Sequence, residues 1–156
     1  MPVRSFSFLV GILYTALGFL GLTSIFVEPI SDIPEIMTQV GVTEGFGYIL
    51  GLFPTNVFGG FVYLVIGFAG FVGSRAPEGA ARIIVDFFAV WLGLFSLLGI
   101  VPVANTLFGL MPIFGNDVWL HLATALPAAY FGFIKDRGAA GRASVKPREQ
   151  REPYYQ

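Results

Sequence analysis

The sequence contains no cysteine, a single histidine and few charged residues. Without cysteine the chain can form no disulfide, thiolate metal site, iron–sulfur cluster or cysteine nucleophile. A single histidine excludes sites that need two, such as paired-histidine zinc sites. Only 12% of the 156 residues are charged, whereas about 25% are charged in ordinary soluble domains. These absences exclude most catalytic metal centres and a typical water-exposed surface.

Apolar residues, glycine and phenylalanine are abundant instead. Hydrophobic residues make up 55% of the chain, which also contains 20 glycines and 17 phenylalanines. Glycine is more frequent in transmembrane helices than in soluble ones. We therefore predict an all-α integral membrane protein whose main partner is the lipid bilayer, and we expect no binding of nucleic acid.

Long stretches almost free of charge predict four transmembrane helices, since one crossing needs about 20 apolar residues. The expected helices lie near 5–27, 56–74, 82–101 and 118–134. The first is too long for the core of a cleaved signal peptide, so we expect it in the mature protein. Four crossings in sequence predict two tandem helical hairpins, with both termini on one side of the membrane.

The basic residues indicate which side that is. All nine Lys and Arg lie at Arg4, at Arg75 and Arg82, or from Lys135 onward. The loops at 28–55 and 102–117 contain none. Since Lys and Arg are enriched in cytoplasmic loops, we expect both termini in the cytoplasm. The expected location is a bacterial inner membrane or a thylakoid membrane.

We divide the chain into a transmembrane domain at 1–137 and a basic, polar cytoplasmic tail at 138–156. The tail is poor in apolar residues and contains two prolines, so in isolation it is expected to be disordered. A partner would have to order it. The residues that we expect to contact a partner are Tyr154, Tyr155, Arg148 and Arg151.

An internal repeat is visible at an offset of 58 residues. The sequence GLFP at 51–54 matches GLMP at 109–112, and the same offset places Tyr63 on His121. We interpret the unit as two helices joined by an outer loop, used twice in parallel. The two short apolar segments are expected to lie along the membrane interface rather than to re-enter the membrane, where backbone must be covered by protein.

His121 is the strongest candidate for a functional residue, because ionisable side chains within membrane helices are commonly functional. A neutral imidazole can ligate haem iron or a chlorophyll magnesium. Alternatively, His121 forms a structural hydrogen bond to a neighbouring helix. Nearby, Asn116 and Asp117 are preferred residues for capping the start of a helix, and Trp119 is typical of the membrane interface. These four residues form the candidate polar or pigment-contact site; no metal site is expected.

The segments LGLFPTN at 50–56 and TLFGLMPIFGNDVWLH at 106–121 resemble an uncharacterised bacterial family of four-helix membrane proteins. This family is described as a domain of unknown function and is common in cyanobacteria and actinobacteria. The resemblance extends roughly from Phe6 to Phe133, and the GNDVWLH sequence is most similar to cyanobacterial members. It implies a four-helix fold and a thylakoid or plasma-membrane setting, but no activity.

The chain departs from this family early in the second helix. Family members commonly carry histidines there in an HN-x-x-H-like pattern, whereas this chain has Gly59, Gly60 and Tyr63. The histidine of the fourth helix is retained as His121. A role that requires both histidine sets is therefore not expected here.

The sequence contains no nucleophile–base pair, metal-ligand cluster or phosphate-binding glycine loop, so we do not expect an enzyme. We predict a non-enzymatic accessory subunit that packs against a larger membrane complex and other membrane subunits. A photosystem is the specific complex expected, with chlorophyll or carotenoid as the associated pigment. The alternative is a small transporter or channel that uses the two-fold repeat, with Asn116, Asp117 and His121 near its path.

Overall fold

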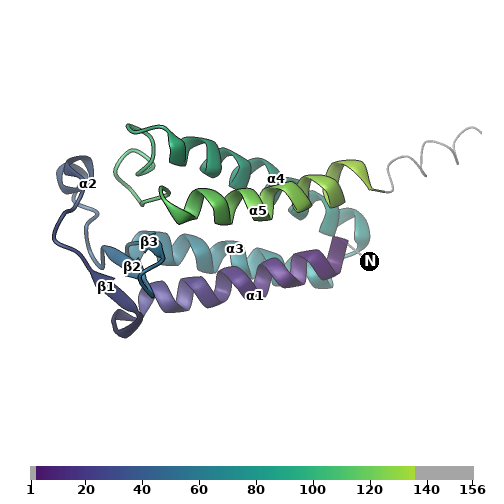
Figure 1. Cartoon of the computed structure of the whole chain (residues 1–156). Helices are drawn as coiled ribbons and strands as arrows, with labels where there is room; N and C mark the ends of the chain where they lie inside the picture. Colours follow the sequence, from purple (N-terminus) through teal and green to yellow (C-terminus); the bar gives the residue numbers. More distant parts are fainter. Residues whose placement is uncertain (1–2, 136–156) are drawn as a thin grey trace, which may run out of the picture.

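The computed structural model describes residues 3–135 and shows four helices side by side, with a small cap at one end (Figure 1). The helices are α1 (Val3–Leu22), α3 (Val57–Arg75), α4 (Glu78–Ile100) and α5 (Asn116–Ala129). Within the described residues α1, α3 and α4 are long and apolar enough to cross a membrane. The start of α1 and the α3–α4 turn lie at the end opposite the cap.

The fourth helix is the shortest of the bundle. α5 has 14 residues, about 21 Å at 1.5 Å per residue, which is less than the roughly 30 Å of a hydrocarbon core. Pro127 near its end lacks an N–H group for the helical ladder. The chain continues as a π-helical turn, η2 (Tyr130–Ile134). Arg82 Nη1 caps this end by donating to Lys135 O at 2.6 Å, so the helical segment extends to residue 134.

The first helix is shorter than the sequence predicts. We expected it to reach residue 27, and this was wrong, because α1 ends at Leu22. A short 3-10 turn, η1 (Ser24–Phe26), follows, and Val27 then pairs with Ile49 across a sheet. Pairing in the sheet satisfies backbone groups that would otherwise continue the helix.

A three-stranded antiparallel sheet forms part of the cap and corrects the expectation of a purely helical fold. The strands, in sheet order, are β1 (Val27–Pro29), β2 (Gly47–Ile49) and β3 (Phe53–Thr55). Gly47 allows the close approach of β1, since a Cβ atom there would collide with the carbonyl of Glu28. The tight β2–β3 turn places Leu50 and Gly51 at positive φ.

A short helix, α2 (Glu35–Val40), completes the cap beside this sheet. Gly41 follows it with a φ of 79°, a left-handed conformation that glycine commonly adopts at the end of a helix. Met37 of α2 is fully buried. The loop at 28–55 thus contributes to the packed interior of the cap.

Asn56, immediately before α3, holds several parts of the cap together. Its Oδ1 accepts a hydrogen bond from Gly59 N at 2.7 Å and so caps α3. Its Nδ2 donates to Val42 O at 2.9 Å and to Leu110 O at 2.8 Å. Because the side chain is fully buried, water cannot replace these bonds.

Asn116 makes the reciprocal contact with the other apolar segment. Its Nδ2 donates to Leu52 O at 2.9 Å, while Asn56 donates to Leu110 O. Leu52 and Leu110 occupy the same position in the GLFP and GLMP segments. The two segments therefore exchange hydrogen bonds, although only the first of them contributes a strand, β3.

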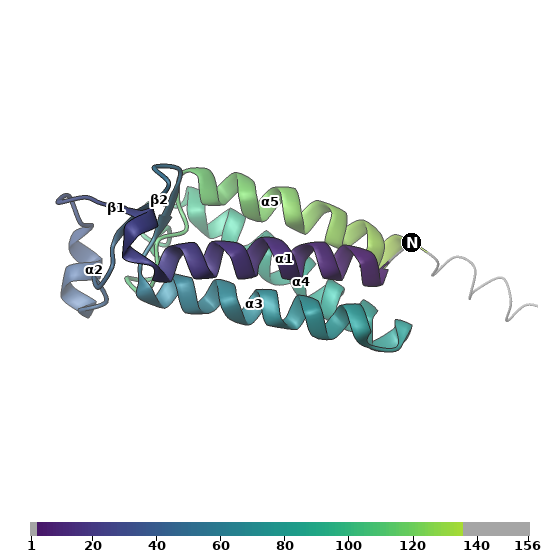
Figure 2. The same cartoon turned by 90° about the horizontal axis from the view of Figure 1, so that it is seen from below.

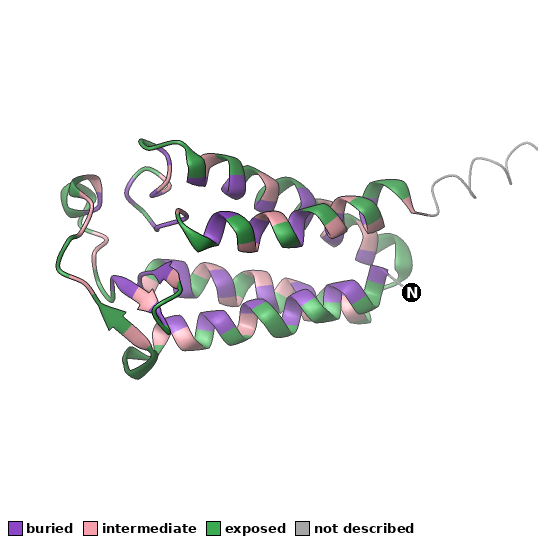
Figure 3. Ribbon diagram, in the orientation of Figure 1, coloured by how far each residue is buried: buried purple, intermediate pink, exposed green. Residues whose placement is uncertain are grey.

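The helices pack as two pairs, α1 with α3 and α4 with α5 (Figures 1 and 2). Buried residues face the interior and exposed residues face outward (Figure 3). α1 and α3 approach closely because of glycine, since a Cβ atom on Gly70 would collide with the backbone of Gly11. We call the contact zone between the two pairs the hairpin seam.

Candidate functional site

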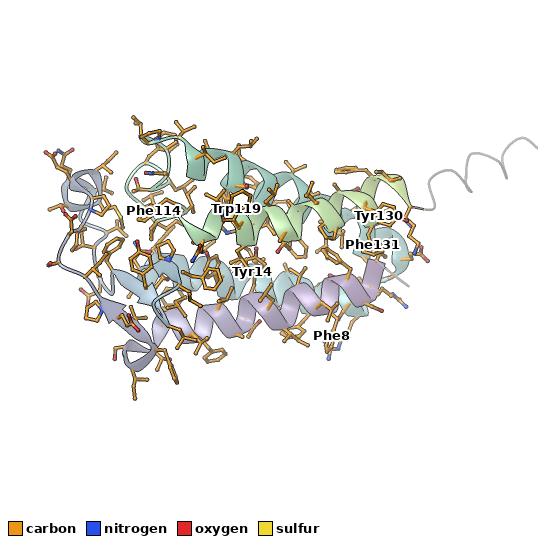
Figure 4. All side chains as sticks on the ribbon, in the orientation of Figure 1. Phe8, Tyr14, Phe114, Trp119, Tyr130 and Phe131 are labelled. Carbon is orange, nitrogen blue, oxygen red and sulfur yellow. The ribbon has the colours of Figure 1, made fainter. Side chains whose placement is uncertain are left out.

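Buried polar side chains gather in the hairpin seam. Tyr14 of α1 and Tyr63 of α3 meet Asp117, His121 and Thr124 of α5, and all five residues are at most 5% exposed. Tyr14 lies between its own helix and α5 (Figure 4). We call these five residues the polar centre.

The hydrogen bonds of the polar centre leave several atoms without a partner. Tyr63 Oη donates to Asp117 Oδ2 at 2.6 Å, and Tyr14 Oη donates to Thr124 Oγ1 at 3.4 Å. Asp117 Oδ1 and both ring nitrogens of His121 have no hydrogen-bond partner among residues 3–135. An unpartnered buried polar atom costs about 1–3 kcal/mol. Each of these three atoms therefore destabilises the fold unless a bound group gives it a partner.

Aromatic rings from three helices surround His121. Its ring is stacked on Tyr14 at 6.4 Å between centroids, with an angle of 7° between the planes. Tyr63 and Phe95 approach edge-on at 6.1 and 5.5 Å. The fully buried imidazole therefore offers no open access to a large planar molecule. The rings packed around His121 leave its nitrogens inaccessible to a chlorophyll, so these residues do not form a chlorophyll-binding site.

The structure separates the four candidates that the sequence grouped together. Asp117 and His121 are both inside the polar centre, whereas Trp119 is 67% exposed. Asn116 is exposed and bonds Leu52 O of the cap. The helix-capping expectation was wrong for both polar residues, because Gly115 precedes α5 and Asp117 turns inward toward Tyr63.

The expected partner contacts Tyr154, Tyr155, Arg148 and Arg151 lie outside the described residues. Conversely, Tyr14 and Thr124 were not predicted to be part of a site. The sequence does contain one feature that predicts a shared face on α5. Asp117, His121 and Thr124 follow one another at intervals of four and three residues, which places them on one side of a helix.

An apolar groove between α3 and α4 is the second notable feature. It has a volume of about 400 Å³. The side chains that line it are all apolar: Phe58, Phe61, Val62, Val65, Ile66, Phe87, Trp91 and Phe95. Phe95 also contacts His121, so a single aromatic ring separates this α3–α4 groove from the polar centre.

The exposed face of α3 continues the groove as a line of large side chains. Successive members are three and four residues apart: Phe58, Phe61, Val65, Phe68 and Val72. We call this line the α3 stripe. Spacings of three and four are typical of the contact face between two packed helices. The stripe covers 58–72, about 21 Å along the helix.

Comparison with known proteins identifies a family but no characterised relative. No curated protein matches this chain, and no solved structure matches it. One family, described as domain of unknown function DUF4383, matches residues 4–134. This match covers most of the sequence and confirms the resemblance to an uncharacterised family. The chain belongs to the DUF4383 family.

Proposed function

We propose that this protein is a non-enzymatic accessory subunit that packs against a larger membrane complex. In this proposal a transmembrane helix of a partner subunit lies along the α3 stripe and fills the α3–α4 groove. The observation that carries the proposal is the exposed, wholly apolar groove with a helical line of large side chains beside it.

A partner helix accounts for both the groove and the α3 stripe beside it. A facing helix inserts its side chains between knobs spaced three and four residues apart, which is the spacing of the α3 stripe. A flat pigment or a lipid chain requires an apolar wall but no such periodicity. The length of the stripe, about 21 Å, suits a membrane-embedded helix.

Native electrophoresis of gently solubilised membranes tests this proposal. The wild-type protein should migrate within a larger complex, and a Phe61→Ala, Val65→Ala double variant should migrate free. The matched control is Phe19→Ala, which removes an exposed ring from α1 and should leave the complex intact. A wild-type protein found only as a monomer or homodimer would show that the proposal is wrong.

The identity of the complex is a further part of the proposal. The family resemblance makes photosynthetic complexes the first to examine, and the membrane is then a thylakoid or a bacterial inner membrane. Stoichiometric photosystem polypeptides should co-purify with the wild-type protein and not with the groove variant. Carotenoid absorbance that follows the protein without any polypeptide would instead assign the groove to a pigment.

We also propose four crossings, with α5 and η2 as the fourth, and termini in the cytoplasm. The nine basic residues support this orientation because none lies in 28–55 or 102–117. The absence of cysteine makes single-cysteine labelling direct. A membrane-impermeant maleimide should label Asp32→Cys in intact spheroplasts and Gly79→Cys only after lysis. The opposite pattern would reverse the orientation.

A transporter is the second candidate, and the inward position of Asp117 and His121 is the observation that favours it. Purified protein in liposomes should then conduct ions or small solutes. An Asp117→Asn, His121→Ala double variant should lose this flux. Equal flux in both proteins would remove the polar centre from any transport mechanism, and no flux in either would leave the accessory-subunit proposal alone.

A further inference from the structure

Asp117 and His121 are placed to act together. They are four residues apart on α5, which brings their Cβ atoms to about 5–6 Å on one helix face. Both side chains are fully buried. Nevertheless, neither ring nitrogen bonds the carboxylate directly, and Asp117 Oδ1 also has no partner within the described part of the chain.

The groups that face this pair come from every helix of the bundle. α1 contributes Tyr14, α3 contributes Tyr63, and α4 contributes the apolar ring of Phe95. Tyr63 occupies Asp117 Oδ2 but leaves Oδ1. Among residues 3–135, the side-chain hydrogen bonds and ring contacts of the pair involve these three residues and no Lys or Arg.

Two buried ionisable groups that lie on one helix face but share no hydrogen bond suit a bridging water molecule. Internal waters typically make about three hydrogen bonds to polar groups that would otherwise be unsatisfied. One water between Asp117 Oδ1 and the nearer nitrogen of His121 would give both atoms a partner. An imidazole nitrogen can accept or release a proton, and a nearby carboxylate can stabilise the charged ring.

We propose that Asp117 and His121 form an internal proton site, in which a bound water joins Asp117 Oδ1 to a ring nitrogen of His121. Proton uptake transfers a proton from a hydronium ion in bulk water, through the bridge, to the nitrogen lone pair. The bridging water accepts one proton and passes another to the ring, so the net change is one O–H bond of the hydronium ion broken and one N–H bond formed. Asp117 is the second residue of α5, so the pair lies at the end of the bundle that carries the cap. This inference does not depend on the α3–α4 groove.

Because His121 is the only histidine, nitrogen-15 histidine labels one side chain in the full chain. Solid-state NMR in liposomes can measure magnetisation transfer from water to its ring nitrogens between about pH 4 and pH 9, around the usual titration range of histidine. The proposal predicts transfer from water and a ring signal that changes through one titration. A ring without water contact and without any pH dependence would overturn it.

Variants test the role of Asp117 in the same experiment. Asp117→Asn removes the carboxylate that stabilises the charged ring. The midpoint of the His121 titration should therefore move to lower pH, by at least about tenfold in proton concentration. The matched control Thr124→Ala, which removes a polar-centre hydroxyl that bonds Tyr14 and Leu120, should move it less than about twofold. Equal midpoints in wild type and Asp117→Asn would overturn the pairing. If Asp117→Asn does not fold, Tyr63→Phe replaces it, since this change removes the bond to Oδ2.

Discussion

The α1–α3 interface and the hairpin seam are built in contrasting ways. Between α1 and α3, glycines bring the backbones together, and Ser7 Oγ donates to Gly70 O at 2.9 Å. In the seam, large side chains separate the helix pairs and enclose unpartnered polar atoms. Close backbone packing leaves no room for a ligand, whereas the seam has both an internal polar site and an external groove. The α1–α3 pair is therefore the closely packed scaffold of the bundle, and the seam is the region in which we propose that ligands and partners bind.

The largest effect is expected at the glycine contact. Gly70→Ala places a Cβ atom against the backbone of Gly11. Overpacking typically costs about 1–3 kcal/mol. Because the colliding atoms here are backbone and cannot rotate away, we expect a loss of about 4 kcal/mol or more. Gly93→Ala on α4 is the matched control, because its nearest neighbour is Ala125 Cβ at 3.8 Å. Alanine there should be neutral or stabilising by up to about 1 kcal/mol. Reversible unfolding in bicelles measures both, and equal stabilities would contradict the scaffold assignment.

The cap should respond next, through its two asparagines. Asn56→Ala removes three buried hydrogen bonds and should cost about 2–4 kcal/mol, given roughly 1 kcal/mol or more for each. Asn116→Ala removes one exposed bond and should cost about 1 kcal/mol or less. Hydrogen exchange at 42–46 and 106–112 should rise mainly in the Asn56 variant. A larger effect from Asn116 would contradict the assigned role of Asn56.

A matched pair of tyrosine variants sharpens the description of the polar centre. Tyr63→Phe leaves Asp117 Oδ2 without its 2.6 Å partner and should cost about 1–3 kcal/mol. Tyr14→Phe removes only a 3.4 Å contact to Thr124, so it should cost less than about 1 kcal/mol. Reversible unfolding in bicelles measures the stability of both tyrosine variants. The reverse order would mean that Asp117 is satisfied elsewhere.

The smallest effect on stability is expected in the groove. Phe61 is 55% exposed, so Phe61→Ala should change the stability of the isolated protein by less than about 0.5 kcal/mol. A loss of several kcal/mol would show that the ring supports the bundle itself rather than an external partner.

Much of the helical framework could be predicted from the sequence, because long apolar runs must bury their own backbone groups as helices. The β1–β3 sheet could not, since strands of three residues depend on partners distant in the chain. The inward direction of Asp117 was also missed. A shift of one position in the start of the helix decides whether Asp117 caps the helix or points into the bundle. The sequence does not define the start that closely, and the hydrogen bond from Tyr63 holds Asp117 inside.

Site-specific photocrosslinking tests the central claim most directly. A benzophenone amino acid at position 61, in the α3–α4 groove, is compared with one at position 19 on the exposed face of α1. In native membranes we expect position 61 to crosslink to one integral membrane polypeptide that co-migrates with this protein on native gels. Position 19 should crosslink to lipid. Equal crosslinking at both positions, or only lipid or a second copy of this chain at position 61, would contradict the account.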